Sequence, residues 1–335
     1  MEESQNSDVE ELSLSFNNLV DKDLNLFFTF GFEIDLESPN NNYFNSSINC
    51  LINIKTLSNF LLQQPANNSY IDLIAQMKIE KDKNKTEQNL NLIKEKFITL
   101  KNQIFNKTKN IKNQNPRQLI EFLIKSIDKD IGIPLEMKTK FNKICSVCPE
   151  KLQIQLNLFN FNIPEIIKHI KDNNIKKITL NECFDYYFNS LNKDRIFICD
   201  NCNSKNIKVS INKLPDILII FIDYGKDKNI CYDIPFKFEE EIDFNNFNYL
   251  SNEDKKRKYF LSSIIACKNI GTYFEIFFTF SRMEMGNKNY VLYNGSEVRQ
   301  NLGVNYILNK PNINFKNKKE SYPFVLVYNK NEDIK

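Results

Sequence analysis

The chain lacks tryptophan and has little glycine or histidine. Its 335 residues include no Trp, seven Gly and a single His, His169. Asn, Lys, Ile and Phe are abundant instead, which indicates coding bias from an AT-rich genome more than a function. Because imidazole is the usual general base near neutral pH, one histidine restricts the catalytic sites that the chain can build.

The chain also lacks a long hydrophobic segment and a strong net charge. Its longest apolar run, residues 217–222, has the length of a β-strand, so we expect no membrane partner. The first residues are acidic and have no signal-peptide pattern, so we expect a disordered acidic tail over 1–24 and a location in the cytoplasm or nucleus. With 45 basic and 42 acidic side chains, the net charge is +3 and no direct DNA binding is expected.

The first half of the chain shows helical spacing. Apolar residues recur every three or four positions between Tyr43 and about Gln63, which predicts a helix there. The same period predicts a second helix over 87–105. A third is predicted to begin at Asn115, a capping residue that is followed by Pro116 in the first turn.

After about residue 150 the hydrophobic period changes to two. The segment KLQIQLNLF alternates as a half-buried strand does, and IKVSI, DILIIFID, YFLSSIIAC, YFEIFFTFS and YPFVLVY continue the pattern. Helices followed by strands predict an α+β protein with an antiparallel sheet. No Gly- or Pro-rich linker divides the chain, so we expect one domain that carries an insertion.

Two C-x-x-C pairs are the strongest chemical signal. Four thiolates complete the tetrahedron that Zn²⁺ prefers and leave no open position for catalysis, so the pattern predicts one structural zinc ion. Four unrelated buried thiols are the alternative. The predicted ligands are Cys145, Cys148, Cys199 and Cys202, and the isolated cysteines, which are predicted to pack in the core, are Cys50, Cys183, Cys231 and Cys267.

Several segments, taken in order along the chain, resemble the conserved boxes of the ubiquitin-specific protease (USP) family. Residues 39–51, PNNNYFNSSINCL, resemble Gly-Asn-Thr-Cys-Tyr-Leu/Met-Asn-Ser-x-Leu-Gln-Cys-Leu, and RQLIEFL resembles Gln-Asp-Ala-x-Glu-Phe-Leu. The paired C-x-x-C motifs match the family's fingers region. The later boxes are matched by LPDILIIFI, IPFKFEEEID, YFLSSIIACKNIGTYFEIFF and YVLYNGSEV.

This resemblance implies a papain-like USP fold with a helical thumb, an antiparallel β palm, and β fingers that carry a zinc knuckle. It implies a single USP-like domain over residues 25–332, with the zinc-bearing fingers inserted at about 140–212. It also implies ubiquitin, a ubiquitin-like protein or subunits of a protein complex as partners.

The same boxes depart from the family at its catalytic positions. Asn42 stands where the family has its nucleophilic cysteine, and Thr272 stands where it has its histidine base. Asn294 occupies the position that orients the histidine. Glu37 occupies the oxyanion-hole position, where a carboxylate would repel the developing negative charge. The resemblance therefore implies a pseudoenzyme with no functional catalytic residue.

The chemistry favours the same interpretation without the family. Amide hydrolysis by cysteine needs a thiolate and a base that generates it. An asparagine amide cannot be this nucleophile, and a threonine hydroxyl is a poor base at neutral pH. His169 lies in the predicted insertion, and Cys50 lies two helical turns beyond Asn42, about 12 Å along a helix, so neither replaces the missing pair.

Three functions stay open at this point. The first is a non-catalytic scaffold that binds ubiquitin or a protein complex. The second is a structural subunit of the spliceosomal tri-snRNP, because CLINIKTLSNFLL resembles a helix of the inactive spliceosomal USP-family member, although that member has lost the finger cysteines. The third is a divergent deubiquitinating cysteine protease with unrecognised catalytic residues.

Overall fold

The computed structural model describes eighteen stretches and single residues of the chain between positions 42 and 330. These are residues 42–63, 69–70, 87–107, 115–132, 137–148, 151–156, 158–170, 177–193, 199, 201–204, 207–225, 236–245, 247, 250–270, 274–282, 289–294, 297–303 and 321–330. The predicted acidic tail over 1–24 lies outside them.

Four helices precede the first strand of the described chain. They are α2 (Asn42–Ile52), α3 (Lys55–Leu62), α5 (Glu87–Lys107) and α6 (Pro116–Asp130). The predicted start of α6 is confirmed, because the Asn115 side chain accepts a hydrogen bond from the backbone N–H of Gln118 at 3.0 Å and Pro116 occupies the first turn.

The single helix predicted from Tyr43 to about Gln63 is wrong in one respect, since it is divided between α2 and α3. Two side chains bind carbonyls near the break: Asn53 donates to the Asn49 carbonyl at 2.6 Å, and Ser58 donates to the Ile52 carbonyl at 2.7 Å. The apolar spacing continues across the break, and all six positions that carry it are buried: Phe44, Ile48, Leu51, Ile54, Leu57 and Leu61.

The main sheet has eight strands in the order β12-β11-β10-β9-β13-β6-β3, with β8 paired to β9. All neighbouring strands are antiparallel except β3 and β6, so the predicted antiparallel sheet is confirmed with one parallel pair at its edge. The strand bounds are β3 (Phe159–Asn162), β6 (Ile217–Asp223), β8 (Glu241–Asp243), β9 (Lys258–Ile270), β10 (Phe274–Arg282), β11 (Asn289–Asn294), β12 (Glu297–Gly303) and β13 (Ser321–Lys330).

Two smaller sheets complete the described strands. One has three antiparallel strands in the order β2-β1-β5, namely β2 (Lys151–Leu156), β1 (Thr139–Cys145) and β5 (Ile207–Lys213). The other pairs β4 (Ile178–Thr179) with β7 (Phe236–Lys237) in parallel. Three more helices are α7 (Ile163–His169), α8 (Leu180–Lys193) and α10 (Asn252–Lys255).

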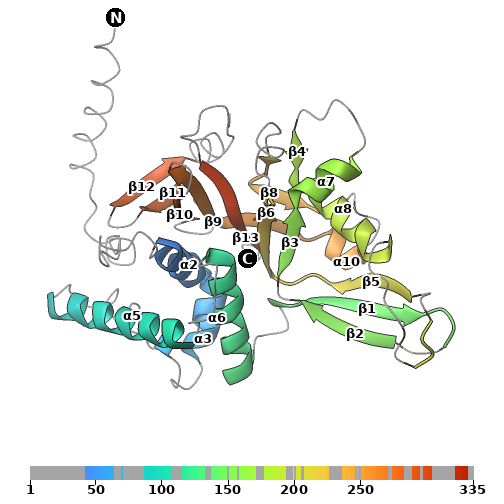
Figure 1. Cartoon of the computed structure of the whole chain (residues 1–335), viewed down its shortest axis with the longest axis horizontal. Helices are drawn as coiled ribbons and strands as arrows, with labels where there is room; N and C mark the ends of the chain where they lie inside the picture. The colour runs from blue at the N-terminus through green and yellow to red at the C-terminus, as the bar shows by residue number, and fades with distance from the viewer. Residues whose placement is uncertain are drawn as a thin grey trace, which may run out of the picture.

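The helices and sheets are arranged around the main sheet. In Figure 1, α2, α3, α5 and α6 gather beside the end of the main sheet that holds β10–β12, whereas α7, α8 and α10 lie toward the end that holds β3. The three-stranded sheet projects below. Of the range predicted as the insertion, about 140–212, β1, β2 and β5 form this small sheet, and β3 belongs to the main sheet.

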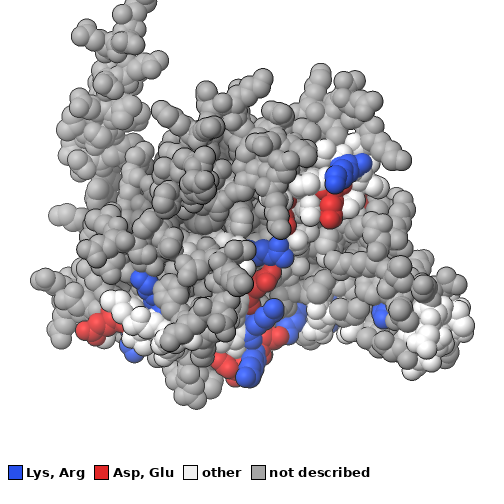
Figure 2. All heavy atoms as spheres, in the orientation of Figure 1, with Lys and Arg blue, Asp and Glu red and all other residues white. Residues whose placement is uncertain are grey.

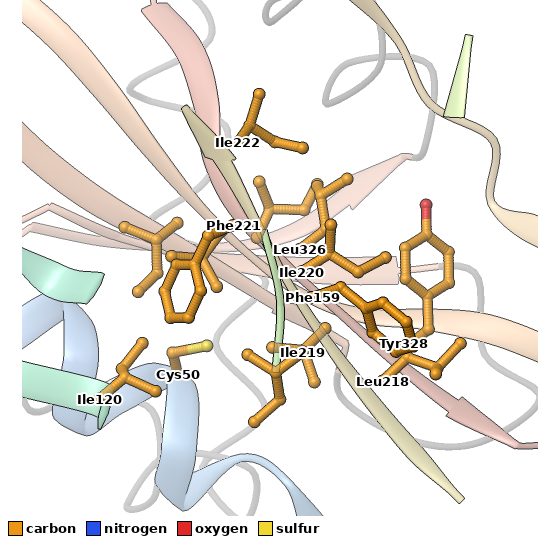
Figure 3. Packing of buried hydrophobic residues seen from close by; sticks show 14 of the residues in the cluster. Cys50, Ile120, Phe159, Leu218, Ile219, Ile220, Phe221, Ile222, Leu326 and Tyr328 are labelled. Carbon is orange, nitrogen blue, oxygen red and sulfur yellow. The ribbon is translucent and has the colours of Figure 1, made fainter. Parts of the chain in front are cut away.

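One hydrophobic cluster runs from Tyr43 to Tyr328 and joins the helices to the main sheet. Strand β6 lies at its centre, and residues 217–222 are all buried because both faces of the strand are covered. Figure 3 shows Phe221 on the side of Cys50 and Ile120, and Leu218 beside Tyr328.

The described surface carries both signs of charge. Arg117 pairs with Glu121 at 3.0 Å on α6, and Lys138 pairs with Asp128 at 2.7 Å. In Figure 2, the described basic and acidic atoms around α6 lie side by side, as the balanced composition predicts. Within the described part of the chain, no helix is both long and apolar enough to cross a membrane.

Candidate metal centre and degenerate catalytic positions

The four cysteines of the two C-x-x-C motifs lie together at one end of the small sheet. Their sulfur atoms are all within 4.8 Å of one another. Two contacts join the two motifs: Cys145 Sγ lies 3.5 Å from Cys202 Sγ, and Cys148 Sγ lies 3.4 Å from Cys199 Sγ. These separations are far beyond a covalent disulfide bond of about 2.05 Å.

The pairing of β1 with β5 explains why the motifs meet. Cys145 is the last residue of β1, and it lies opposite Ile207, the first residue of β5. One motif therefore begins where β1 ends, and the other lies just before β5 begins. Antiparallel pairing puts the C-terminal end of β1 beside the N-terminal end of β5, at the same end of the small sheet.

Backbone hydrogen bonds shape both turns. The N–H of Val147 donates to Cys145 Sγ at 3.3 Å. In the second turn, the N–H of Asn203 donates to the Cys199 carbonyl, and the N–H of Cys199 donates to the Ser204 carbonyl, both at 2.9 Å. Asn203 has a φ of 53°, in the left-handed region that Asn tolerates better than most residues.

Backbone hydrogen bonds to Cys145 favour the thiolate form of its sulfur. Backbone donors, first that of Cys148 and then that of Val147, lower the pKa of Cys145 from 9.0 to about 6. A thiolate is the form that binds a metal ion. A tetrahedral site with Zn–S bonds of about 2.3 Å requires sulfur separations of about 3.8 Å, which lies within the range observed here. The four cysteines therefore fit a metal ion.

Helix α2 is fixed tightly between α6 and the main sheet. Asn42, the predicted counterpart of the family's nucleophile, is the first residue of the helix. Thr279 of β10 donates to the carbonyl of Ser46 at 2.8 Å. Ser47 donates to the carbonyl of Tyr43 at 2.7 Å and lies 3.5 Å from the carbonyl of Pro116 in α6.

These hydroxyl contacts were not predicted from the sequence. Thr279, Ser263 and Ser281 occupy buried positions of β9 and β10, and Ser263 and Ser281 lie opposite each other with their oxygens 3.0 Å apart. Their signal in the sequence is a small polar residue at inward-facing positions of apolar strands. Such residues need partners when buried, and here helix α2 supplies one of them.

Three of the isolated cysteines lie in the core, as predicted: Cys50, Cys183 and Cys267. Burial raises the pKa of Cys50 to about 12, although a hydrogen bond with Ser263 lowers it in part. Figure 3 shows Cys50 beside Ile120, with its sulfur directed away from Ile120 into the hydrophobic cluster. Cys231 lies outside the described residues.

The single histidine lies on a different element from α2. His169 is the last residue of α7, it is exposed, and its ring packs against Tyr186 of α8 with 5.0 Å between centroids. Asn294, at the position predicted to orient the histidine, ends β11 and lies opposite Glu297 of β12, with which β11 pairs in antiparallel. Glu37 and Thr272 lie outside the described residues.

Helices packed on an eight-stranded, mostly antiparallel sheet, with a four-cysteine centre on a separate small sheet, define the architecture of the ubiquitin-specific proteases. Residues 37–328 match the family model described as ubiquitin carboxyl-terminal hydrolase, so the chain belongs to this family. The predicted α+β USP fold is thereby confirmed.

Three solved structures with the same fold are SAGA DUB modules. A chain of the SAGA DUB module of Ubp8, Sgf11, Sus1 and Sgf73 bound to monoubiquitin superimposes with a TM-score of 0.61 and 16% identity, over 97% of this chain and 75% of that chain. The module bound to ubiquitin aldehyde gives 0.58 and 14%, over 92% and 71%. A yeast SAGA module with an Sgf73 mutant gives 0.55 and 15%, over 88% and 67%. No curated protein matches significantly.

Proposed function

We propose that this protein is a non-catalytic member of the family, a zinc-containing scaffold that binds ubiquitin, a ubiquitin-like protein or the subunits of a larger complex. One observation carries the proposal: position 42 at the start of α2 is Asn, and the chain's single imidazole lies on α7. In Figure 1, α7 and α2 lie well apart, so His169 is not placed to activate a group on α2.

None of the described cysteines is suited to act as a substitute nucleophile. Cys50 is the cysteine of α2, and its buried thiol stays protonated at neutral pH because its pKa is raised to about 12. Cys183 and Cys267 are also buried. The remaining four described cysteines form the candidate metal centre, which is closed by its own four sulfurs.

Zinc is the metal that we propose for this centre. Four cysteine sulfurs are soft donors that suit Zn²⁺ in a closed tetrahedral site, and such sites are structural. Residues Cys145, Cys148, Cys199 and Cys202 would hold the ion and so join β1 to β5. Elemental analysis of the purified protein tests the identity of the metal.

The partners are proposed from the fold and its relatives. The similar SAGA chains were solved with monoubiquitin, with ubiquitin aldehyde, and with Sgf11, Sus1 and Sgf73. If this chain keeps the binding surface of its fold, it binds ubiquitin or complex subunits without cutting. Affinity purification with mass spectrometry identifies the partners, and titration against ubiquitin then measures whether it is one of them. Recovery of small nuclear ribonucleoproteins would favour the spliceosomal alternative.

The decisive test of the missing chemistry uses a fluorogenic substrate attached to the ubiquitin C-terminus. We expect the wild-type protein, Asn42→Ala and Asn42→Cys to release fluorophore at the rate of buffer alone. Asn42→Cys restores a sulfur but no base, so its thiol remains mostly protonated at neutral pH. An active family member measured in parallel shows that the substrate is intact.

The same assay can also contradict the proposal. Hydrolysis of the fluorogenic substrate by the wild-type protein above the buffer rate would contradict the proposal. So would covalent labelling of any of its cysteines by ubiquitin vinyl sulfone.

A further inference from the structure

We propose that the four-cysteine centre is also a redox-sensitive crosslink. Oxidation replaces the metal by two disulfides between the motifs, Cys145–Cys202 and Cys148–Cys199. The inference rests on the proposed function for its starting state, the metal-bound protein. The metal holds the end of β1 beside the turn before β5, and the disulfides would hold the same elements together after the metal has left.

The distances select these two pairs. Sulfurs of different motifs are in contact, at 3.5 Å for Cys145 and Cys202 and 3.4 Å for Cys148 and Cys199. A disulfide forms only when two sulfurs approach to about 2.05 Å, so pairs that are already in contact need little movement. Within the first motif, the hydrogen bond from Val147 N–H to Cys145 Sγ fixes the turn in its present shape.

Exposure gives each pair one accessible and one protected sulfur. Cys202 is exposed, while its partner Cys145 is only 7% exposed. Cys148 is half-buried, while its partner Cys199 is only 1% exposed. An oxidant in solution therefore reaches one sulfur of each pair first, and the second sulfur lies ready beside it to resolve the product.

The reaction balances with hydrogen peroxide as the oxidant. Peroxide transfers one oxygen to the accessible thiol, which gives a sulfenic acid and one water. The neighbouring thiol attacks the sulfenic sulfur, so an S–S bond forms and a second water leaves. Each disulfide thus consumes one peroxide and oxidises two thiols. Starting from metal thiolates, each sulfur also takes up one proton from solvent, and the ion is released.

Each disulfide would close a long loop of chain. Cys145 and Cys202 are 57 positions apart, and Cys148 and Cys199 are 51 apart. Links across loops of this length restrict the unfolded chain strongly. Disulfides within the motifs, in contrast, would close only short turns and would leave β1 and β5 unlinked. The pairing therefore decides whether the small sheet stays together without metal.

The test is disulfide mapping of the full-length protein. Its metal content is measured first, peroxide is then added stepwise, remaining thiols are blocked with N-ethylmaleimide, and peptides are mapped by mass spectrometry without reduction. We expect the two pairs between motifs, release of one ion per two disulfides as read by a chromogenic chelator, and reversal by dithiothreitol with added zinc. Circular dichroism is expected to keep its far-ultraviolet signal.

Matched variants separate the two pairs. Cys202→Ser is expected to halve the disulfide yield and leave only Cys148–Cys199, and Cys148→Ser is expected to leave only Cys145–Cys202. Bonds within the motifs, or sulfinic and sulfonic acids without disulfides, would overturn the inference. Metal-free protein that still forms the two predicted pairs would refute the proposed zinc while supporting the pairing, so the two failures are distinguishable.

Discussion

The buried thiol of Cys50 lies on the helix that begins at position 42. It contacts Ser263 of β9, and desolvation raises its pKa from 9.0 to about 12. Cys202, by contrast, is exposed on the small sheet. The two cysteines therefore differ in reactivity because of where the fold places them, since accessible thiolate is the reactive form.

This difference predicts the order of alkylation in metal-stripped protein. At pH 8, iodoacetamide is expected to modify Cys202 readily and leave Cys50 unmodified until guanidinium unfolds the chain. The raised pKa alone lowers the thiolate fraction of Cys50 about a thousandfold, and burial adds to the protection. Peptide mass spectrometry with time gives both rates, and equal rates in the folded protein would contradict the burial of Cys50.

The same shift gives stability a pH dependence. Between pH 9 and about 12 the unfolded chain releases the Cys50 proton and the folded chain keeps it. The folded state therefore binds more protons in this window, so its stability falls as the pH rises there and the contribution is fully present below pH 9.

Residue roles that depend on neighbours in the sequence could be predicted, and those that depend on distant partners could not. The cap of α6 was predictable because Asn115 and Pro116 are adjacent. The burial of Cys50 was predicted because an isolated cysteine commonly packs in the core, but its contact with Ser263 was not predicted. The catalytic positions 37, 42, 272 and 294 were inferred from motif resemblance alone, and no side-chain geometry is described for them.

Helices and strands could likewise be predicted where they depend on local sequence, and not where they depend on distant partners. The strands β6, β9, β10 and β13 were predicted because the hydrophobic period changes to two after about residue 150. The break between α2 and α3 was not, because it depends on side-chain bonds to carbonyls rather than on apolar spacing. The parallel pairing of β3 with β6 was not predicted either, since it joins segments separated by α7, β4, α8 and β5.

The loop after β6 depends on a close backbone approach to α7. Gly225 has a φ of +70°, and a Cβ added there would lie 2.9 Å from Cγ of Pro164, in the first turn of α7. Gly132, after α6, has a φ of +84° but nothing within 4 Å of the same position. Substitutions at the two glycines can therefore distinguish the cost of backbone strain from the cost of steric overlap.

Alanine substitutions at both glycines are expected to destabilise the protein unequally. Gly132→Ala should cost about 1 kcal/mol of unfolding free energy, from the left-handed backbone alone. Gly225→Ala should cost about 1–3 kcal/mol more, because the new methyl group overlaps the proline ring. Urea denaturation measures both, and Gly225→Ala combined with Pro164→Ala is the control. Equal losses at the two glycines would show that the contact with Pro164 is unimportant.

The small sheet and the main sheet meet at a polar junction between β5 and β6. The Leu214 N–H donates to Asp254 at 3.3 Å, and Arg257 donates to the Leu214 carbonyl at 2.7 Å. Arg257 also pairs with Asp254 at 3.1 Å and with Asp216 at 3.5 Å, and Tyr259 donates to the Pro215 carbonyl at 2.6 Å. The short connection 214–216 is therefore held to the main sheet.

The two sheets are held together by different interactions. The main sheet is held by the cluster that joins it to the helices, whereas the far end of the small sheet has the candidate metal centre. The two C-x-x-C motifs predicted the centre, because their ligand spacing is local. The junction could not be predicted, because Leu214 is 40 positions from Asp254 and 43 from Arg257, and these residues show no motif.

Removal of the metal is therefore expected to loosen the small sheet before the main sheet. A structural metal contributes folding free energy at its ligands, and these ligands join the ends of β1 and β5. After treatment with a strong chelator under reducing conditions, amide hydrogen exchange should accelerate at least tenfold in β1 and β5. Amides of β9 and β13 should keep their rates, since the connection 214–216 is anchored independently of the metal. Addition of zinc should restore the slow exchange, and Cys199→Ser should resemble the chelated state. Simultaneous loss of protection in β13 would instead mean that the two sheets unfold as one cooperative unit.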